Sequence, residues 1–285
     1  MTLESLLPLA KQVICALFSL ILPFFGIGLP ETGAKAPAPE TVRIMSFNVR
    51  DGEFDREEIV PQVIADYLPD SVGLQECEGT WYLTLKTYLP DYKIIGVGRL
   101  TGIPLIGEST AIMYRADKYE LVDWGTFWLS ETPDRVSKGW DANYPRTCTW
   151  AVLKNKQTGE CYAHINTHLD NGGAQARKHG LDMILEKAAS FDMPVVVTGD
   201  FNLSKGSELY ETLVSGVLTD VSEIAETADS GGTAHGYGGG TGGNPIDFIC
   251  VNEKVTEVKS YSIMREKYND RYVSDHYPIY SDMMF

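Results

Sequence analysis

The sequence predicts an α/β layered sandwich with mixed β-sheets, formed by one domain that follows residue 40. Three observations support this fold class. Short apolar runs of strand length recur between turn residues along the chain. A few segments have helical spacing instead, and they do not alternate strictly with the strands, as they do around an all-parallel sheet. With 285 residues, 44% of them hydrophobic, the chain can bury a large core, and no linker divides residues 41–285.

Residues 1–40 are expected to lie outside this domain. Residues 13–29 are almost entirely apolar and follow Lys11, and a stretch rich in Pro, Ala and Gly extends to Pro39. This pattern is typical of a signal peptide or an N-terminal membrane anchor followed by a linker. Ala34-Lys35-Ala36 has the form of a cleavage site, but Pro37 follows, so cleavage and anchoring both stay open. We therefore expect an exported monomer, either secreted or attached through this segment to the extracytoplasmic face of the membrane.

In the first half of the domain, the spacing of apolar residues predicts two helices among short strands. Residues 59–67 have helical spacing, and Pro61 falls in the first turn, where proline is tolerated. Trp81, Leu85 and Tyr88 predict the second helix. The expected strands are Thr41–Val49, Ser71–Gln75 and Tyr92–Gly96, with Thr110–Tyr114 and Tyr119–Trp124 as a pair.

The second half contains a predicted hairpin, a helix and four further strands. Thr147–Leu153 and Cys161–His168 are expected to form the hairpin, and Ala174–Ser190 is expected to form a helix with one apolar face. The aromatic and polar segment Phe127–Tyr144 is expected to be a loop at the wall of a site. The remaining strands are Val195–Thr198, Ile246–Val251, Val255–Met264 and Pro278–Met283, with a glycine-rich loop at Gly231–Gly243.

Polar side chains recur where these strands end. A single Asn or Asp after a strand is usually a turn former, and a single His is usually structural. So many polar strand ends in one domain are harder to explain by turns, and loops at strand ends are a favoured place for sites. The candidate residues are Asn48, Glu76, His168, Asp200 with Asn202, Asp247, and Asp275 with His276.

Asp200 and Asn202 follow a run of three valines and stand two residues apart. In extended chain such residues point to the same side. A carboxylate at the end of a buried strand costs free energy unless a metal ion, a proton or a hydrogen-bond donor compensates it. The alternative is a strand that ends in an ordinary Asx-type turn.

The inventory of these side chains suits phosphoester hydrolysis. Glu76, Asp275 and the Asn48 carboxamide offer hard oxygen ligands for Mg²⁺ or Mn²⁺. Histidines can handle protons or stabilise a phosphoryl oxyanion near neutral pH. The reaction needs a metal to offset negative charge, a base to activate water, and donors around phosphorus. A metal-activated water suffices, so no Ser or Cys nucleophile and no covalent intermediate are expected.

The order of six motifs resembles the endonuclease/exonuclease/phosphatase superfamily, the group of pancreatic-type deoxyribonucleases, apurinic-site endonucleases, neutral sphingomyelinases and inositol-polyphosphate 5-phosphatases. The resemblance extends from about Val42 to the C-terminus. It implies a four-layer sandwich in which two mixed β-sheets pack face to face with helices outside. The motifs are Ser46-Phe47-Asn48, Gln75-Glu76, Thr167-His168-Leu169, Gly199-Asp200-Phe201-Asn202, Ile246-Asp247-Phe248-Ile249 and Ser274-Asp275-His276.

The resemblance also implies roles for the matching residues. Glu76 is the expected principal metal ligand, helped by Asn48 and Asp275. His276 is expected to activate water or contact the scissile phosphate, with Asp247 orienting its ring.

Further roles concern the attacking water and the phosphate. Asp200 is expected to position or deprotonate the water, or to assist the leaving group, and Asn202 to donate a hydrogen bond to the phosphate. His168 resembles a second catalytic histidine, and Glu108 resembles the acid that pairs with it; the alternative for Glu108 is a solvated loop residue. Arg146 is expected to clamp phosphate, or else to form an ion pair with an acid. His164 and His179 are expected to be structural.

Two features bear on the substrate and the number of metal ions. Arg50 stands where repair enzymes carry an acid, so one metal ion or two stays open. The formal charge of −15, without any block of Lys or Arg, argues against tight non-specific binding to nucleic acid. We therefore expect hydrolysis of a phosphodiester or phosphomonoester of a small molecule or lipid headgroup. An exported Mg²⁺-dependent endonuclease acting on DNA or RNA is the alternative, because bound cations reverse the local field; a catalytically inactive binding module is a third reading.

Overall fold

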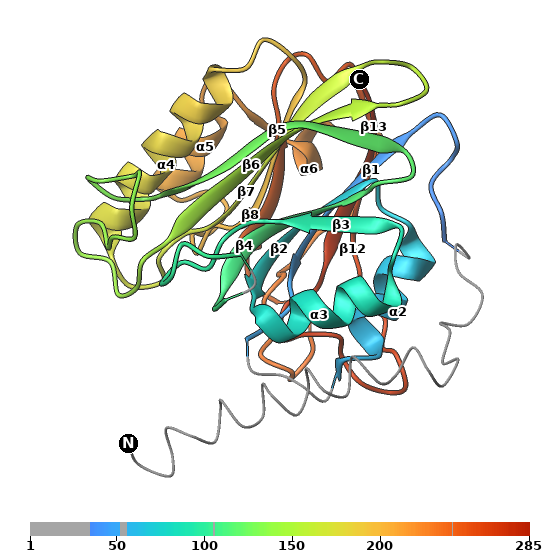
Figure 1. Cartoon of the computed structure of the whole chain (residues 1–285), viewed down its shortest axis with the longest axis horizontal. Helices are drawn as coiled ribbons and strands as arrows, with labels where there is room; N and C mark the ends of the chain where they lie inside the picture. Colours follow the sequence, from blue (N-terminus) through green and yellow to red (C-terminus); the bar gives the residue numbers. More distant parts are fainter. Residues whose placement is uncertain (1–34, 52–55, 105, 241) are drawn as a thin grey trace.

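The computed structural model describes residues 35–51, 56–104, 106–240 and 242–285, which form two mixed β-sheets with helices outside them (Figure 1). The predicted signal peptide or anchor falls on residues 1–34, which lie outside the described residues. Among the helices that are described, none is long and apolar enough to cross a membrane.

The seven-stranded sheet contains the N-terminal and C-terminal strands of the domain side by side. Strand β1 pairs in parallel with β2 and antiparallel with β13, so the sheet is mixed. Its strands, in spatial order, are β10 (Thr227–Ala228), β12 (Glu257–Ile263), β13 (Ile279–Met284), β1 (Val42–Asn48), β2 (Ser71–Cys77), β4 (Ser109–Arg115) and β3 (Tyr92–Ile95).

The six-stranded sheet is built around the parallel pair β7 and β8. The predicted hairpin is confirmed as β6 and β7, which pair antiparallel. In spatial order the strands are β5 (Tyr119–Trp128), β6 (Thr147–Asn155), β7 (Cys161–His168), β8 (Val195–Asp200), β11 (Asp247–Val251) and β9 (Thr219–Asp220).

Three buried apolar clusters separate four layers, which confirms the predicted sandwich. One cluster lies between the seven-stranded sheet and the helices α2 (Ile59–Tyr67) and α3 (Gly79–Tyr88), a second lies between the two sheets, and a third joins the six-stranded sheet to α4 (Ala174–Ala189) and α5 (Glu208–Val214). Figure 1 shows α2 and α3 on one side of the molecule and α4 and α5 on another. A short helix, α6 (Val221–Ile224), follows β9 directly.

Alternation along β8 shows how the sequence specifies these layers. Val195 and Val197 pack into the cluster under α4, whereas Val196 packs between the sheets, because successive side chains point to opposite faces. The strand is therefore apolar on both faces, as a central strand covered on both sides has to be. Continuing the same alternation, Thr198 and Asp200 share the side of Val196.

One predicted pairing is wrong. Thr110–Tyr114 and Tyr119–Trp124 were expected to pair, but β4 lies between β2 and β3 in the seven-stranded sheet, and β5 pairs with β6 in the other. Ala116 to Lys118 carries the chain from one sheet to the facing one. A short turn between two strand patterns is compatible with a hairpin or with such a crossing, and local spacing does not distinguish them.

Candidate active site

Polar side chains from both sheets meet at one end of the sandwich. The parallel strands β1 and β2 place Asn48 opposite Gln75, and the parallel strands β7 and β8 place His168 opposite Asp200. The antiparallel strand β11 begins with Asp247, also opposite Asp200. Asn48 Nδ2 donates to Asp200 Oδ2 at 3.1 Å, so this contact joins the two sheets. The expected convergence of strand ends is therefore present.

Glu76 reaches this cluster through a strained backbone. Its φ is +55°, in the left-handed region, and it lies at an irregularity of the β2–β4 pairing between Leu74 and Cys77. Such a conformation costs free energy in a residue other than glycine and persists where the surroundings hold it. The carboxylate accepts a hydrogen bond from Asn48 Nδ2 at 3.2 Å and another from Asp51 N at 3.0 Å. The departure from the ladder thus turns Glu76 toward Asn48.

His276 lies between two buried carboxylates. Its Nδ1 donates to Asp247 Oδ2 at 2.9 Å, as predicted, and its Nε2 is 3.9 Å from Asp200 Oδ2. Burial by itself lowers the pKa of His276, but the carboxylates of Asp247, Asp200 and Asp275 outweigh it and raise the pKa above its usual value. The ligand atoms of Asp200, Asp247 and His276 lie within 4.8 Å of one another, as in a metal site. Because the carboxylates favour the protonated ring, which donates at both nitrogens and has no lone pair for a metal ion, an acid–imidazolium–acid chain describes the group better.

Asp200 is an almost fully buried carboxylate at the centre of this chain. Burial, with the neighbouring Asp247 charge, raises its pKa well above that of an exposed aspartate, while His276 acts in the opposite direction. Its Oδ1 accepts a hydrogen bond from the backbone N–H of Asn202 at 3.1 Å. A carboxylate with a raised pKa is suited to accept a proton near neutral pH.

Asn202 follows Asp200 with a left-handed backbone, at φ +49°, which asparagine tolerates better than most residues. Its Nδ2 donates to the backbone oxygen of Leu169 at 3.0 Å, which fixes the orientation of the carboxamide. Asn202 lines the same pocket as Asp200 and His276.

His168 is buried and its Nε2 lies 3.5 Å from Asp200 Oδ2. Burial, together with the positive charges of Arg146 and Arg99, lowers its pKa well below the usual value. The expected contact with Glu108 is not found: His168 Nδ1 is buried without a hydrogen-bond partner among the described residues. Glu108 is bound instead by both terminal nitrogens of Arg99, at 2.7 and 2.5 Å. A guanidinium fork matches a carboxylate in a way that a single imidazole N–H does not.

Asn48, Glu76 and Asp275 are the predicted metal ligands, and they present the hard oxygen atoms that Mg²⁺ and Mn²⁺ prefer. Nη1 of Arg50 lies 3.7 Å from Glu76 Oε2 and 3.6 Å from Asp275 Oδ2. The carboxylates of Glu76 and Asp275 therefore lie near the same Arg50 nitrogen, at a place where a positive charge is stabilised. The donor set fits a divalent cation.

Arg146 lines the same pocket as Asp200 and His276. It is 6% exposed, and its Nε lies 3.5 Å from Asp170 Oδ2, the one ion pair that it makes within the described part of the chain. Asp170 is held in turn by the backbone N–H groups of Gly172 and Gly173, at 3.0 and 2.7 Å.

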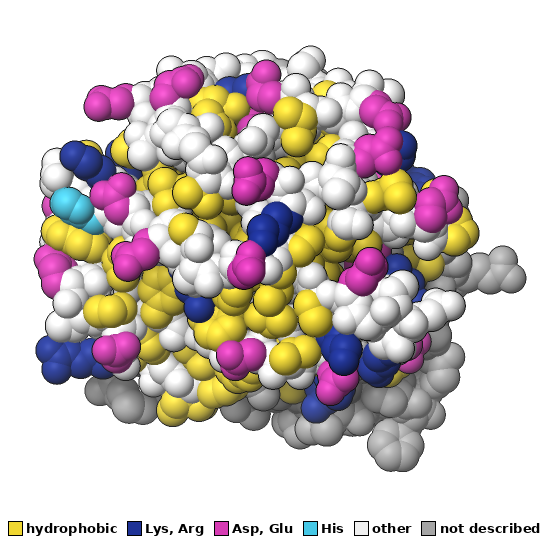
Figure 2. Space-filling model, turned by 90° about the horizontal axis from the view of Figure 1, so that it is seen from above, with side chains coloured by type: hydrophobic (Ala, Val, Ile, Leu, Met, Phe, Trp, Pro, Cys, Tyr) yellow, Lys and Arg dark blue, Asp and Glu magenta, His cyan; other side chains and the backbone are white. Residues whose placement is uncertain are grey.

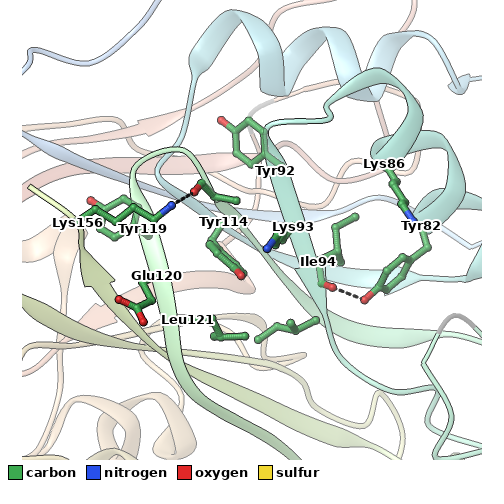
Figure 3. A pocket seen from close by; sticks show the side chains of 12 residues that line it. Tyr82, Lys86, Tyr92, Lys93, Ile94, Tyr114, Tyr119, Glu120, Leu121 and Lys156 are labelled. Carbon is green, nitrogen blue, oxygen red and sulfur yellow. Dashed lines mark hydrogen bonds between the residues drawn. The ribbon is translucent and has the colours of Figure 1, made fainter. Parts of the chain in front are cut away.

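These residues enclose a polar pocket of about 360 Å³. A larger cavity of about 620 Å³ lies elsewhere, against β3, β4 and β5, with Tyr82, Tyr114 and Lys156 among its lining residues (Figure 3). None of the predicted site residues lines that cavity. The smaller pocket is lined by Arg50, Asp51, Glu76, Arg99, Glu108, Tyr144, Arg146, His168, Asn171, Asp200, Asn202 and His276.

Four residues of this pocket were missed by the sequence analysis: Asp51, Arg99, Tyr144 and Asn171. Arg99 follows the strand β3 by four residues and Asn171 follows β7 by three. Extending the search for polar residues past every predicted strand end would have found both. Tyr144 belongs to the long segment that was expected to wall a site.

The face of the molecule in Figure 2 has acidic side chains spread over it, several of them beside Lys or Arg. This mixed surface is in keeping with the net charge of −15. A basic stripe of the kind that grips a nucleic-acid backbone is not what this face presents.

A model of the Endonuclease/Exonuclease/phosphatase family matches residues 45–276, a range that includes every predicted strand-end site residue. A mannosyl-6-phosphatase from Bacteroides thetaiotaomicron VPI-5482 is 34% identical, with a TM-score of 0.82 over 86% of this chain and 100% of that one. A protein titled endonuclease/exonuclease/phosphatase from Bacteroides vulgatus is 37% identical, with a TM-score of 0.81 over 86% and 99% of the two chains.

More distant structures share the fold. The catalytic domain of human nocturnin, solved with a bound sulfate anion, is 19% identical, with a TM-score of 0.67 over 86% of this chain and 94% of that one. At that identity the likeness shows a common architecture alone. No curated protein matches the sequence.

Proposed function

The chain belongs to the endonuclease/exonuclease/phosphatase family, and from that premise we propose that it is a divalent-metal-dependent phosphoester hydrolase for small phosphorylated molecules. The observation that carries this proposal is the meeting of Glu76, Asp200 and His276 around one polar pocket. A structural role does not explain why the buried acid Asp200, with its raised pKa, lies beside the His276 imidazolium. Groups with such perturbed pKa values cluster at active sites.

In the proposed reaction Asp200 accepts a proton from the attacking water. His276, kept cationic by Asp247, stabilises the negative charge that develops on the phosphoryl oxygens. Neutral His168, with its Nε2 3.5 Å from Asp200 Oδ2, lies close to the same carboxylate. Asn48, Glu76 and Asp275 would hold Mg²⁺ or Mn²⁺, which supplies Lewis acidity toward the phosphate when bound. The ester is cleaved by water without a covalent enzyme intermediate.

The substrate class that we propose is a phosphorylated sugar. The protein of 34% identity over nearly all of this chain is described as a mannosyl-6-phosphatase. The pocket volume of about 360 Å³ fits a phosphate with a small leaving group. Tyr144 and Asn171 stand at the wall of that pocket, and an aromatic ring with a carboxamide suits the faces and hydroxyl groups of a sugar.

A nuclease is the second candidate. Its supporting observation is the arrangement of two histidines, His168 and His276, whose Nε2 atoms lie 3.5 and 3.9 Å from Asp200 Oδ2. The acidic composition weighs against it, because a polyanionic substrate would meet a chain of charge −15.

We also propose that the protein is exported and acts as a monomer. The support for export is the apolar segment 13–29 with the Pro/Ala-rich stretch behind it. Fractionation of cells that express the full chain tests the location, and an intact chain in the cytoplasm would contradict export. Sedimentation of the purified chain tests the monomer.

A substrate panel tests the proposed activity. The purified full-length chain is incubated with mannose 6-phosphate, 4-nitrophenyl phosphate, bis(4-nitrophenyl) phosphate, sphingomyelin, plasmid DNA and RNA, each with Mg²⁺ and each with excess EDTA. We expect phosphate release from the sugar phosphate with Mg²⁺ and none with EDTA.

Cleavage of DNA or RNA at a higher kcat/KM than that of the sugar phosphate would favour the nuclease. Hydrolysis that is unchanged by EDTA, or no hydrolysis of any compound, would contradict both enzyme proposals.

A further inference from the structure

Arg99 stands in the wall of the catalytic pocket, and nothing in the family motifs assigns it a role. It lies in the loop between β3 and β4, where its backbone oxygen accepts a hydrogen bond from Trp128 Nε1 at 2.8 Å. Its backbone N–H donates to the oxygen of Glu108 at 2.8 Å. Main-chain and side-chain contacts therefore fix the guanidinium at the pocket, with 15% of the side chain exposed.

Arg99 and Arg146 are brought close together although like charges repel. The positive charge of each lowers the pKa of His168, and Arg99 lowers that of Arg146. Tyr144 lies beside both, with its ring centroid 5.0 Å from the Arg99 guanidinium carbon and 5.9 Å from that of Arg146. Two guanidinium groups that line one buried polar pocket raise the free energy of the folded protein unless an anion compensates their charge.

The same wall carries buried nitrogen atoms that lack a hydrogen-bond partner within the described residues. They are Nε of Arg99 and Nδ1 of His168, and Nε of Arg146, which makes no hydrogen bond although it lies 3.5 Å from Asp170 Oδ2. Buried polar atoms are normally bonded, and each exception calls for a physical explanation. Arg146 is only 6% exposed and lines the pocket. The wall of the pocket therefore has hydrogen-bond donors that are available to a ligand.

We propose that Arg99 and Arg146 form a subsite for the terminal oxygens of a phosphomonoester dianion, and that this subsite makes the enzyme prefer monoesters to diesters. The inference rests on the proposed function and deepens it. A phosphomonoester carries close to two negative charges at pH 7 and has three free oxygens. A diester carries one charge and has two free oxygens, so it compensates the two guanidinium charges less fully.

Steric arguments point the same way. Arg99 and Glu108 form a bidentate ion pair that lines the pocket. A second ester arm that extends toward this pair would have to displace it. Glu108 also offsets one positive charge when the pocket holds no ligand, which explains how two arginines are tolerated there.

The test compares Arg99→Gln with the unaltered full-length chain. We measure kcat/KM in Mg²⁺ for 4-nitrophenyl phosphate and bis(4-nitrophenyl) phosphate, and the Kd for inorganic phosphate by calorimetry. We expect the monoester kcat/KM to fall by about 100-fold, the diester value to stay within about threefold, and phosphate to bind at least about tenfold more weakly. Arg99→Lys, which keeps the charge and loses the fork, should fall between the two.

Two variants keep the result interpretable. Arg99→Gln combined with Glu108→Gln removes both partners, so no buried carboxylate is left unpaired if the single variant folds poorly. Arg115→Gln is the matched control, since Arg115 forms a similar pair with Asp117, at 2.6 Å, away from the pocket.

Equal losses for monoester and diester in Arg99→Gln would overturn the proposed selectivity, as would an unaltered enzyme that prefers the diester. If the full chain hydrolyses no ester, the proposed function fails, and phosphate affinity decides the subsite by itself. An unchanged Kd for phosphate in Arg99→Gln overturns it.

Discussion

Two buried polar groups of this protein lie on the same strands and differ in kind. The inter-sheet network consists of Ser46, Ser71, Gln75, His164, Asn166 and Thr198, which lie between the two sheets. The strand-end cluster consists of four buried residues, Asn48, His168, Asp200 and Asp247, and of His276, whose side chain is 12% exposed. Ser46 precedes Asn48 by two residues, and Asn166 and Thr198 stand in the same relation to His168 and Asp200. The two groups are successive rungs on one face of β1, β7 and β8.

The inter-sheet network is neutral and internally bonded. His164 Nδ1 lies 2.8 Å from Ser71 Oγ, and its Nε2 lies 2.9 Å from Thr198 Oγ1. Gln75 Nε2 donates to Asn166 Oδ1 at 2.7 Å and to Ser46 Oγ at 3.1 Å. The Ser71–His164 and Gln75–Asn166 contacts cross from one sheet to the other, so the network fixes how the two sheets sit against each other.

The strand-end cluster is charged and has donors to spare. Asp200 and His276 have raised pKa values because of burial and mutual charge, and His168 Nδ1 has no partner in the described residues. Burial alone therefore does not distinguish a structural polar group from a chemical one. Neutral side chains bonded to one another mark the first, and buried charges with raised pKa values mark the second.

The largest expected effect separates the two groups by activity. Asp200→Asn keeps the shape and removes the base, so kcat should fall by about 10³-fold or more, with Tm unchanged or higher because a buried carboxylate is lost. Thr198→Val, two residues earlier, should lower Tm and leave kcat within about threefold. Steady-state kinetics and thermal melts of both variants check this. Near-wild-type turnover in Asp200→Asn would refute the role given to this residue.

A smaller effect concerns the predicted metal ligand Glu76. Glu76→Gln should weaken Mg²⁺ binding by on the order of 100-fold, because a neutral amide replaces the charged ligand. Calorimetric titration with Mg²⁺ measures this without relying on turnover. Gln75→Glu is not a suitable control, because it buries a charge in the inter-sheet network; Glu120→Gln, at an exposed position on β5, is suitable. Equal Mg²⁺ affinity in Glu76→Gln and the unaltered chain would exclude Glu76 as a ligand.

Gly73 tests the tightness of the inter-sheet network. A Cβ at this position would lie 2.0 Å from Thr198 Oγ1 and 2.5 Å from Asn166 Oδ1, which no real contact allows. Gly73→Ala should lower the free energy of unfolding by about 1–3 kcal/mol, the usual cost of overpacking. Gly206→Ala is the control without a steric clash, because a Cβ at this position would meet nothing within 4 Å. Its φ of +81° adds backbone strain to this variant. Urea unfolding checks both, and a Gly73→Ala chain as stable as the parent would show that the sheets separate easily.

The smallest effect is a pH dependence of stability. Burial lowers the pKa of His164 to about 3, below the unfolded value of about 6.5. As pH falls below 6.5 the unfolded chain takes up this proton and the folded chain does not, so stability is lost in acid. The loss amounts to at most about 1.4 kcal/mol per pH unit. His164→Gln should therefore show a shallower decline of unfolding free energy between pH 6.5 and 4.5.

A control for this prediction is His179→Gln, which alters a histidine whose side chain is 40% exposed. Its pH profile should follow that of the parent. If the pH profile of His164→Gln also follows that of the parent, His164 takes up a proton in the folded protein as it does in the unfolded chain. The inter-sheet network would then be more polar than its hydrogen bonds indicate.

Much of the fold could be predicted from the sequence because the signals are local. The continuous apolar run Val195–Val197 and the helical spacing from Ile59 to Tyr67 are local patterns that neighbouring residues set. The sheet to which a strand belongs is different. β4 and β5 both have clear strand patterns. Residues of β4 pair with residues of β2 that are 30 or more positions away along the chain, and so do some residues of β5 with those of β6. No local period records that choice of partner.

For the site, the sequence by itself determined the kinds of side chain and their places at strand ends. Asn48, Glu76, His168, Asp200, Asn202, Asp247, Asp275 and His276 were named from position and motif, while their roles remain predictions. Only the tertiary structure decided which side chains are in contact. Glu108 binds Arg99 and not His168, and Arg99 and Arg146 line the same pocket. The physical reason is that a strand's chemistry follows from its own residues, whereas contacts between side chains depend on how two sheets and their loops are packed together.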